Sequence, residues 1–232
     1  MISFFNTILY QPLFNALIFF YNYIPLQDFG IAVILLTVII KLIFYPLGVK
    51  AIRSQKALSD LQPKLKEIQE KYKDDKEKQG KEMMELYKKE KINPFSGCLP
   101  MLIQLPVLIA LFWVFRTFEG GVTAEELSNL YSFIPTPEVV NTMFLGLIDL
   151  IKPNIVIAVL AGLGQFFQTR MTTKRTKTKG KDFQNQMQKQ MQYFFPIFTV
   201  IILFRLPSAI GLYWLTTTIF TIIQQYFIFR KK

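Results

Sequence analysis

Five runs of apolar residues, separated by charged segments, constrain this chain more than any other feature of its sequence. The runs approach the ~20 residues with which a helix crosses the ~30 Å hydrocarbon core of a bilayer. Of the 232 residues 51% are hydrophobic, and the mean hydropathy of +0.29 is high for a soluble domain of this size. The pattern predicts an all-α, polytopic membrane protein. We place its five transmembrane helices at residues 29–49, 97–118, 154–172, 193–206 and 208–229.

The basic residues lie almost entirely on one side of these predicted spans. Residues 50–91 hold 13 Lys and Arg, residues 170–189 hold 7 and the tail 230–232 holds 3, of 27 in the chain. Residues 1–28 hold none, and the connection after the second span is acidic. By the positive-inside rule, the N-terminus is outside and the C-terminus is in the cytosol. The remaining connections are then an outer loop at 119–153, a cytosolic loop at 173–192 and a cytosolic tail at 230–232.

The stretch "LFNALIFFYNYIPL" at residues 13–26 is apolar but too short to span comfortably, and Asn15 and Asn22 interrupt it. We interpret residues 1–28 as an outer interfacial amphipathic helix, with Tyr21 and Tyr23 at headgroup level. A sixth span is the alternative. It would place the N-terminus in the cytosol without the basic residues usual there. The segment resembles neither a cleavable signal peptide nor an organelle transit peptide, so we expect a bacterial inner membrane.

Residues 50–93 are predicted to form a cytosolic helical hairpin between the first and second spans. The sequence "KDDKEKQG" separates a longer helical pattern from a shorter one, and both ends of the insertion must return to the membrane. A solvated charged linker is the plain alternative. The hairpin is favoured by one apolar stripe with spacings of 3 and 4 residues, formed by Leu58, Leu61, Leu65, Ile68 and Tyr72. The net basic charge of this insertion suits anionic lipids or ribosomal RNA.

The composition also narrows the possible chemistry. The chain has no His and a single cysteine, Cys98, so a disulfide within one chain, a conventional Cys/His metal site and a catalytic His are excluded. No G-x-x-x-x-G-K-[ST] phosphate-binding loop occurs. We therefore expect a protein that is not an enzyme and that needs neither a cofactor nor a metal.

Lys41 is the residue that the membrane interpretation explains least easily. It lies about 8 residues, or ~12 Å, inside the end of the first predicted span. A snorkelling lysine with a misplaced span boundary is one explanation. The other is a water-filled cavity open to the cytosol, because an unpaired ammonium in hydrocarbon costs at least ~2.5–3.5 kcal/mol. The cavity is favoured because Thr37, Lys41 and Tyr45 recur every four residues, Gln104 and Gln165 lie in other spans, and no span contains an acid.

Several stretches together resemble the YidC family of membrane protein insertases. They are "IIKLIFYPL" followed by "ALSDLQPKLKEIQEKY", then "NPFSGCLPMLIQLPVLIALFW", and near the C-terminus "LPSAIGLYWLTTTIFTIIQQ". The resemblance implies a five-helix core around a hydrophilic groove that is open to the cytosol and to lipid. It also implies insertion and folding of newly made membrane proteins without ATP hydrolysis. The cation of the family's groove is an arginine, where this chain has Lys41, and the other groove residues map onto Thr37, Gln104 and Trp214.

The predicted substrate groove therefore consists of Lys41, Thr37, Gln104, Trp214 and Gln165. Expected partners are nascent membrane proteins, the ribosome, the signal recognition particle receptor, the Sec translocon and anionic lipids, but no DNA. The competing hypothesis is a small-anion transporter or channel in which Lys41 binds the anion. No internal repeat between the two halves favours that hypothesis.

Overall fold

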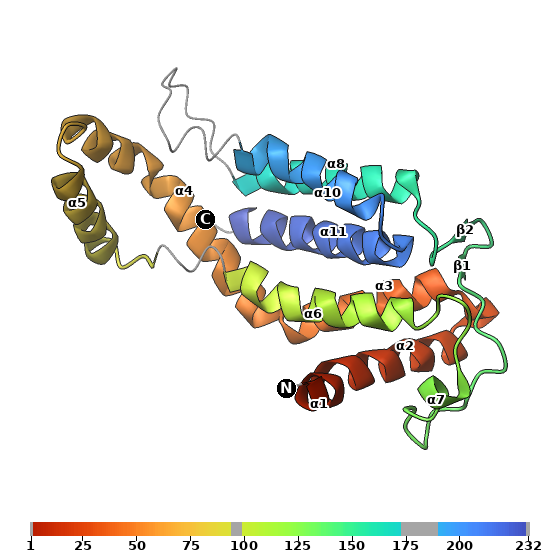
Figure 1. Ribbon diagram of the computed structural model, residues 1–232. Coiled ribbons are helices and arrows are strands. Elements are labelled where there is room, and N and C mark those ends of the chain that lie inside the picture. The colour runs from red at the N-terminus through yellow and green to blue at the C-terminus, as the bar shows by residue number, and fades with distance from the viewer. Residues whose placement is uncertain (1, 94–98, 173–189, 231–232) are drawn as a thin grey trace.

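The computed structural model describes residues 2–93, 99–172 and 190–230, and these residues are mostly helical (Figure 1). Cys98, the first residues of the second predicted span, most of the predicted cytosolic loop 173–192 and residues 231–232 lie outside the described residues. The main helices are α2 (Gln11–Tyr23), α3 (Phe29–Ile43), α4 (Tyr45–Lys71), α5 (Lys76–Lys89), α6 (Leu99–Arg116), α8 (Ile155–Thr172), α10 (Phe195–Leu203) and α11 (Ser208–Arg230). Shorter elements are α1 (Ile2–Phe5), η1 (Asn6–Tyr10), η2 (Pro25–Gln27), α7 (Ala124–Leu127), β1 (Met143–Phe144), β2 (Ile148–Asp149) and η4 (Gln190–Phe194).

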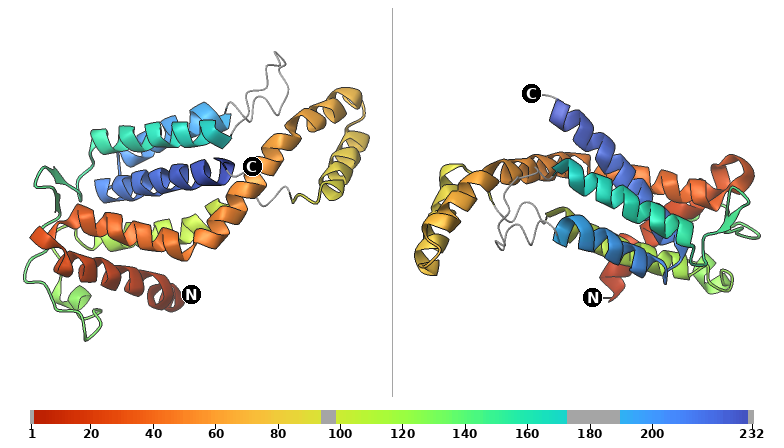
Figure 2. Two further views of the ribbon diagram at one scale, coloured as in Figure 1. Left: turned by 180° about the vertical axis from the view of Figure 1, so that it is seen from behind. Right: turned by 90° about the horizontal axis from the view of Figure 1, so that it is seen from above.

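The helices α3, α6, α8, α10 and α11 form a bundle, in which α11 packs against α8 on one side and against α3 on the other (Figures 1 and 2). One end of the bundle carries α7, β1 and β2, and we call it the loop end. From the opposite end α4 leads to α5, and we call it the hairpin end. The helices α6, α8, α10 and α11 coincide closely with the second to fifth predicted spans.

Length and hydropathy limit which of the described helices qualify as membrane spans. Not one of them, taken singly, is both long and apolar enough to count as a membrane span. The pair formed by α3 and α4 passes the same criteria together, with a bend of 71° between its halves. Shorter apolar helices occupy Gln104–Arg116, Ile155–Met171 and Gln192–Leu203.

The bend between α3 and α4 interrupts the first predicted span. Helix α3 ends at Ile43, and α4 begins at Tyr45, so the helix does not run straight through residues 29–49 as the apolar run suggested. Pro46 lies in the first turn of α4, where its missing N–H costs no helical hydrogen bond. Within a continuous helix the same proline would clash with the preceding turn. The boundary therefore falls where the proline is tolerated best.

The N-terminal elements α1, η1 and α2 form one helix that packs against α3 and α6 (Figure 1). Its buried face repeats at helical spacing through Phe14, Leu17, Ile18 and Tyr21. Asn15, which interrupts this apolar face, is also buried. Its burial is tolerated because its side chain donates to the Asn129 carbonyl at 3.0 Å and accepts from the Tyr131 N–H at 2.6 Å. The polar side of this helix is thus covered by the loop that follows α6.

That loop contains a small antiparallel sheet, which the sequence analysis did not predict. Met143 pairs with Asp149 and Phe144 pairs with Ile148, around a turn in which Leu145 and Gly146 have positive φ. Asp28 connects this turn to the bundle. One oxygen of its carboxylate accepts the Ile31 N–H at 2.8 Å and caps α3, while the other accepts the Leu145 N–H.

The same loop is tied to the start of α11. The Ser208 hydroxyl donates to the Lys152 carbonyl at 2.7 Å, and the Ala209 N–H donates to the Leu150 carbonyl at 2.8 Å. Leu150 itself is completely buried. These contacts close the loop end with backbone and side-chain hydrogen bonds.

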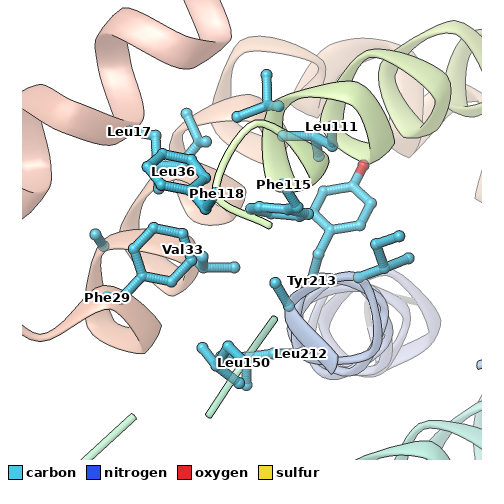
Figure 3. Close-up of a cluster of buried hydrophobic side chains, with 14 of the residues drawn as sticks. Leu17, Phe29, Val33, Leu36, Leu111, Phe115, Phe118, Leu150, Leu212 and Tyr213 are labelled. Carbon is cyan, nitrogen blue, oxygen red and sulfur yellow. The ribbon is translucent and has the colours of Figure 1, made fainter. Parts of the chain in front are cut away.

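The hydrophobic core lies behind this closure, toward the loop end. Figure 3 shows Phe29, Phe115 and Phe118 packed together, and the ring centroids of Phe29 and Phe118 lie 5.0 Å apart in an edge-to-face arrangement. On α6 the described buried residues begin at Val107, whereas Leu102 and Leu105, nearer the hairpin end, are exposed. The tight apolar packing therefore belongs to the loop end.

Glycines let α8 approach its neighbours closely. A Cβ at Gly162 would lie 2.4 Å from Val200 of α10, and a Cβ at Gly211 of α11 would lie 2.8 Å from Ile157 of α8. Both distances are far inside van der Waals contact, so the helix spacing depends on the missing side chains. Small residues at helix contacts are the usual device for close packing in membrane proteins.

Helices α4 and α5 are joined by a short turn and lie alongside each other (Figure 2). Leu61 and Leu65 of the stripe are buried. The Gln79 side chain donates to the Gln69 carbonyl at 2.9 Å, and Lys64 pairs with Glu90 at 2.5 Å. Helix α5 has no buried residue, so little buried surface holds the two helices together.

Candidate functional site

Lys41 lies in the last turn of α3, immediately before the bend, and is half-buried. Among the described residues no ion pair involves it. The helices α3, α6, α8, α10 and α11 contain no Asp or Glu. The bundle therefore offers this ammonium no counter-ion from its own helices.

Thr37 stands one turn before Lys41, but its hydroxyl is already used. The side chain is buried, and it donates to the Val33 carbonyl of its own helix at 2.6 Å. Tyr45, expected to continue the same polar face, belongs to α4 beyond the bend. The predicted face of one straight helix is therefore reduced to Thr37 and Lys41.

Gln104 connects α6 to α11. Its side-chain amide donates to the hydroxyl of Tyr213, which is almost completely buried. In Figure 3 the Tyr213 hydroxyl points from α11 toward α6. Tyr213 was not among the residues predicted from the sequence, although its place next to Trp214 in "GLYWL" was a signal for it.

Gln165 and Trp214 take different positions. The Gln165 amide oxygen accepts the Thr199 hydroxyl at 2.6 Å, which directs this side chain to α10. Because α11 lies between α8 and α3, the structure does not bring Gln165 together with Lys41 (Figure 1). Trp214 is half-buried and packs against the hydrophobic core beside Tyr213.

Further polar groups are buried toward the hairpin end of α11. Thr218, Gln224 and Gln225 are all buried, and the Gln224 side chain donates to the Tyr45 carbonyl at 3.3 Å. The buried oxygens without a hydrogen-bond partner include Oε1 of Gln225 and Oε1 of Gln62. An unpaired buried oxygen costs about 1–3 kcal/mol unless a polar partner reaches it. The hairpin end is thus polar inside as well as less tightly packed.

These features define a class of protein first. A mostly helical bundle with large apolar side chains on its outward faces, and with polar groups and a cation inside one end, is an all-α membrane protein. Exposed apolar residues occur on each bundle helix and include Leu42, Trp113, Leu163, Ile201 and Ile223.

Comparison with known sequences identifies the family. The sequence model described as "60Kd inner membrane protein" matches residues 19–232, so the chain belongs to that family of inner membrane proteins. It is similar to the membrane protein insertase YidC of Fusobacterium nucleatum subsp. nucleatum, with 38% identity over 204 residues, 88% of this chain and 87% of the relative. It is equally similar to the membrane protein insertase YidC of Francisella tularensis subsp. novicida, with 38% identity over 232 residues. That match covers 99% of this chain but 36% of the longer relative.

These findings bear on the two functional hypotheses. Both relatives are named as insertases, which agrees with the resemblance and with a function that is not enzymatic. Neither the family nor the relatives support the alternative of a small-anion transporter or channel.

Proposed function

We propose that this chain is a membrane protein insertase that moves newly made membrane proteins from the cytosol into the bilayer and helps them fold. The observation that carries the proposal is the position of Lys41, a cation without a counter-ion from the bundle, at the polar hairpin end and opposite a closed apolar loop end. Membership of the inner membrane protein family and two relatives named as insertases support it.

In this proposal α3, α6, α8, η4 with α10, and α11 are the five spans. The loop end faces outward, the hairpin end and the C-terminus face the cytosol, and α2 lies at the outer interface. The charge distribution supports this orientation, because residues 50–91 hold 13 basic residues and residues 1–28 hold none. Helices α4 and α5 then form the cytosolic hairpin beside the groove.

A hydrophilic groove at the hairpin end would shorten the dry distance that the polar tail of a substrate must cross. Lys41 attracts acidic residues of that tail. The Gln104 amide donates one N–H to Tyr213 and keeps its second N–H and its oxygen for the substrate, and Trp214 offers its indole N–H. Thr37 is bonded to Val33, and Gln165 is bonded to Thr199 on the far side of α11 from Lys41, so these two shape the walls rather than bind. Burial of the substrate's apolar helix in lipid, at ~0.8 kcal/mol per CH₂, drives the step without ATP.

The polypeptide partners belong to the same proposal. Nascent membrane proteins are the substrates, and the hairpin of α4 and α5 is the element placed to receive them. The ribosome and the signal recognition particle receptor would deliver them to this cytosolic face, and the Sec translocon would act beside the chain in the membrane.

Reconstitution in liposomes tests the proposal. The purified chain receives a single-span substrate with a short acidic outer tail, without nucleotide, and protease protection of that tail is scored. We expect protection well above that of protein-free liposomes. In parallel, flux of phosphate and of a small carboxylate is measured on the same liposomes. Anion flux without substrate protection would replace the insertase with the transporter.

A further inference from the structure

The bend between α3 and α4 forms a distinct surface, which we call the elbow and define as residues 41–56. The chain turns by 71° within it. Large apolar side chains around the turn are exposed, including Leu42, Ile43 and Leu47. Their position at the hairpin end places them where the proposed bilayer meets the cytosol.

Basic side chains follow these apolar ones on α4. Lys50 and Arg53 are three residues apart and share one helix face with Pro46, which lies four residues before Lys50. All three residues are exposed. The opposite face, with Ala51 and Ile52, is buried. That buried side rests on the bundle, where α4 packs against α11. The basic face therefore points away from the bundle.

The charge of the whole insertion is concentrated at this place. Residues 50–59 hold three basic residues and no acidic one, whereas residues 60–91 hold ten basic and nine acidic residues. Among the described residues, neither Lys50 nor Arg53 forms an ion pair. The hairpin beyond the elbow is thus nearly neutral, and the excess positive charge lies next to exposed apolar side chains.

The far end of α11 adds to this cationic surface. Lys56 lies over the Phe229 ring, 5.0 Å from its centroid, and Arg230 follows as an exposed residue. Lys56 and Arg230 thus extend the cationic surface of Lys50 and Arg53 from the elbow onto the end of α11. The nearest acid along α4 is Asp60, beyond this group.

We infer that the elbow is a binding site for the phosphate of an anionic phospholipid of the cytosolic leaflet. Lys50 and Arg53 contact the headgroup, while Leu42, Ile43 and Leu47 pack among the first acyl carbons. An apolar row beside a basic row is the pattern of a helix that lies in a charged membrane interface. RNA would bind the cations but would leave the apolar side chains of Leu42, Ile43 and Leu47 exposed to water. The inference rests on the cytosolic orientation in the proposed function, but not on insertion itself.

The test uses the full chain in a neutral detergent and titrates phosphatidylglycerol, phosphatidylcholine or soluble glycerol phosphate, with bound lipid counted by native mass spectrometry. The variant is Lys50→Gln with Arg53→Gln. The matched control is Lys88→Gln with Lys89→Gln, which removes the same charge from exposed positions on α5. Each cation near an anionic surface raises affinity about fivefold, so we expect the elbow variant to bind phosphatidylglycerol about thirtyfold more weakly.

The control should bind phosphatidylglycerol like the wild type, and glycerol phosphate should not compete. The elbow site would be overturned if both variants bound phosphatidylglycerol with equal affinity, or if the wild type bound phosphatidylcholine as tightly as phosphatidylglycerol. Displacement of phosphatidylglycerol by glycerol phosphate would also overturn it. A short RNA that binds the wild type and excludes phosphatidylglycerol would do so as well. Insertion of the acidic-tailed substrate, scored separately, distinguishes such a failure from a failure of the proposed function.

Discussion

The loop end and the hairpin end of the same helices are packed with different chemistry. At the loop end, aromatic and aliphatic side chains from α2, α3, α6 and α11 interlock, and hydrogen bonds tie the loop to Asp28 and Ser208. At the hairpin end the same helices bury polar groups, some of them unpaired, and carry Lys41. The loop end is therefore tightly packed, whereas the hairpin end has less apolar packing and more buried polar groups, as we expect of the substrate site that we propose there.

The largest expected difference between the ends is the cost of truncating the core. Phe29→Ala removes a completely buried ring in contact with Phe115 and Phe118 and should destabilise the protein by about 3–5 kcal/mol. Thermal unfolding in detergent measures this. The control Phe133→Ala removes a ring that is 70% exposed and should cost under about 0.5 kcal/mol. Similar losses in both variants would contradict the placement of the core.

Two helix caps, one in the bundle and one in the hairpin, should differ in how much they stabilise the protein. Asp28 caps α3, is buried and also bonds Leu145, whereas Asp75 caps α5 in an exposed position by accepting the Lys78 N–H at 3.0 Å. Asp28→Ala should cost about 2–3 kcal/mol, because a cap is lost and a second N–H is left without its partner. Asp75→Ala should cost about 1 kcal/mol or less. Chemical unfolding that ranked the two variants in reverse would show that the loop contributes little.

Within the hairpin end, a buried polar group should be dispensable for stability. Oε1 of Gln225 has no hydrogen-bond partner among the described residues, so Gln225→Leu should leave stability within about 0.5 kcal/mol of the wild type or raise it. The comparison is Thr199→Val, which leaves the Gln165 oxygen without its donor and should cost about 1 kcal/mol. Thermal unfolding of the two variants side by side decides. A marked loss in Gln225→Leu would mean that this end is packed as tightly as the other.

The smallest expected effect concerns the acid sensitivity of the hairpin. The hydrogen bond and charge of Lys64 lower the pKa of Glu90 below its ordinary value. The pair therefore supports the hairpin above the ordinary pKa of Glu and loses its effect as the pH falls through the lowered value. The protection of α5 amides against hydrogen exchange, relative to the intrinsic rate at each pH, should fall below about pH 4, and Glu90→Gln should abolish this fall. Glu77→Gln, which removes a pair within α5, should not abolish it.

The sequence predicted the positions of the helices well and their contacts less well. Hydropathy located α6, α8, α10 and α11 because each apolar run coincides with one helix. The bend escaped notice because residues 42–47 remain apolar on both sides of it, so composition does not reveal the boundary that Pro46 marks. The sheet of β1 and β2 has two residues per strand, too few for an alternating pattern to be recognised.

In the candidate site, too, single residues could be predicted from the sequence, but their contacts could not. Lys41 could be singled out because a cation in an apolar run is rare, and the sequence alone shows that the bundle helices hold no Asp or Glu to pair with it. Partners such as Thr199 for Gln165 and Tyr213 for Gln104 depend on how the helices are rotated against each other. Hydropathy says nothing of that rotation when a helix is apolar on all faces.

The proposed function depends on attraction between the charge of Lys41 and the acidic tail of a substrate. The most direct measurement compares wild type, Lys41→Ala and Lys41→Arg in liposomes, each with an acidic-tailed substrate and a neutral-tailed one. We expect Lys41→Ala to lose about tenfold in protected acidic tail, equivalent to about 1.4 kcal/mol, and little with the neutral tail. Lys41→Arg should keep both activities. Equal insertion of the acidic tail by Lys41→Ala and the wild type would contradict the claim.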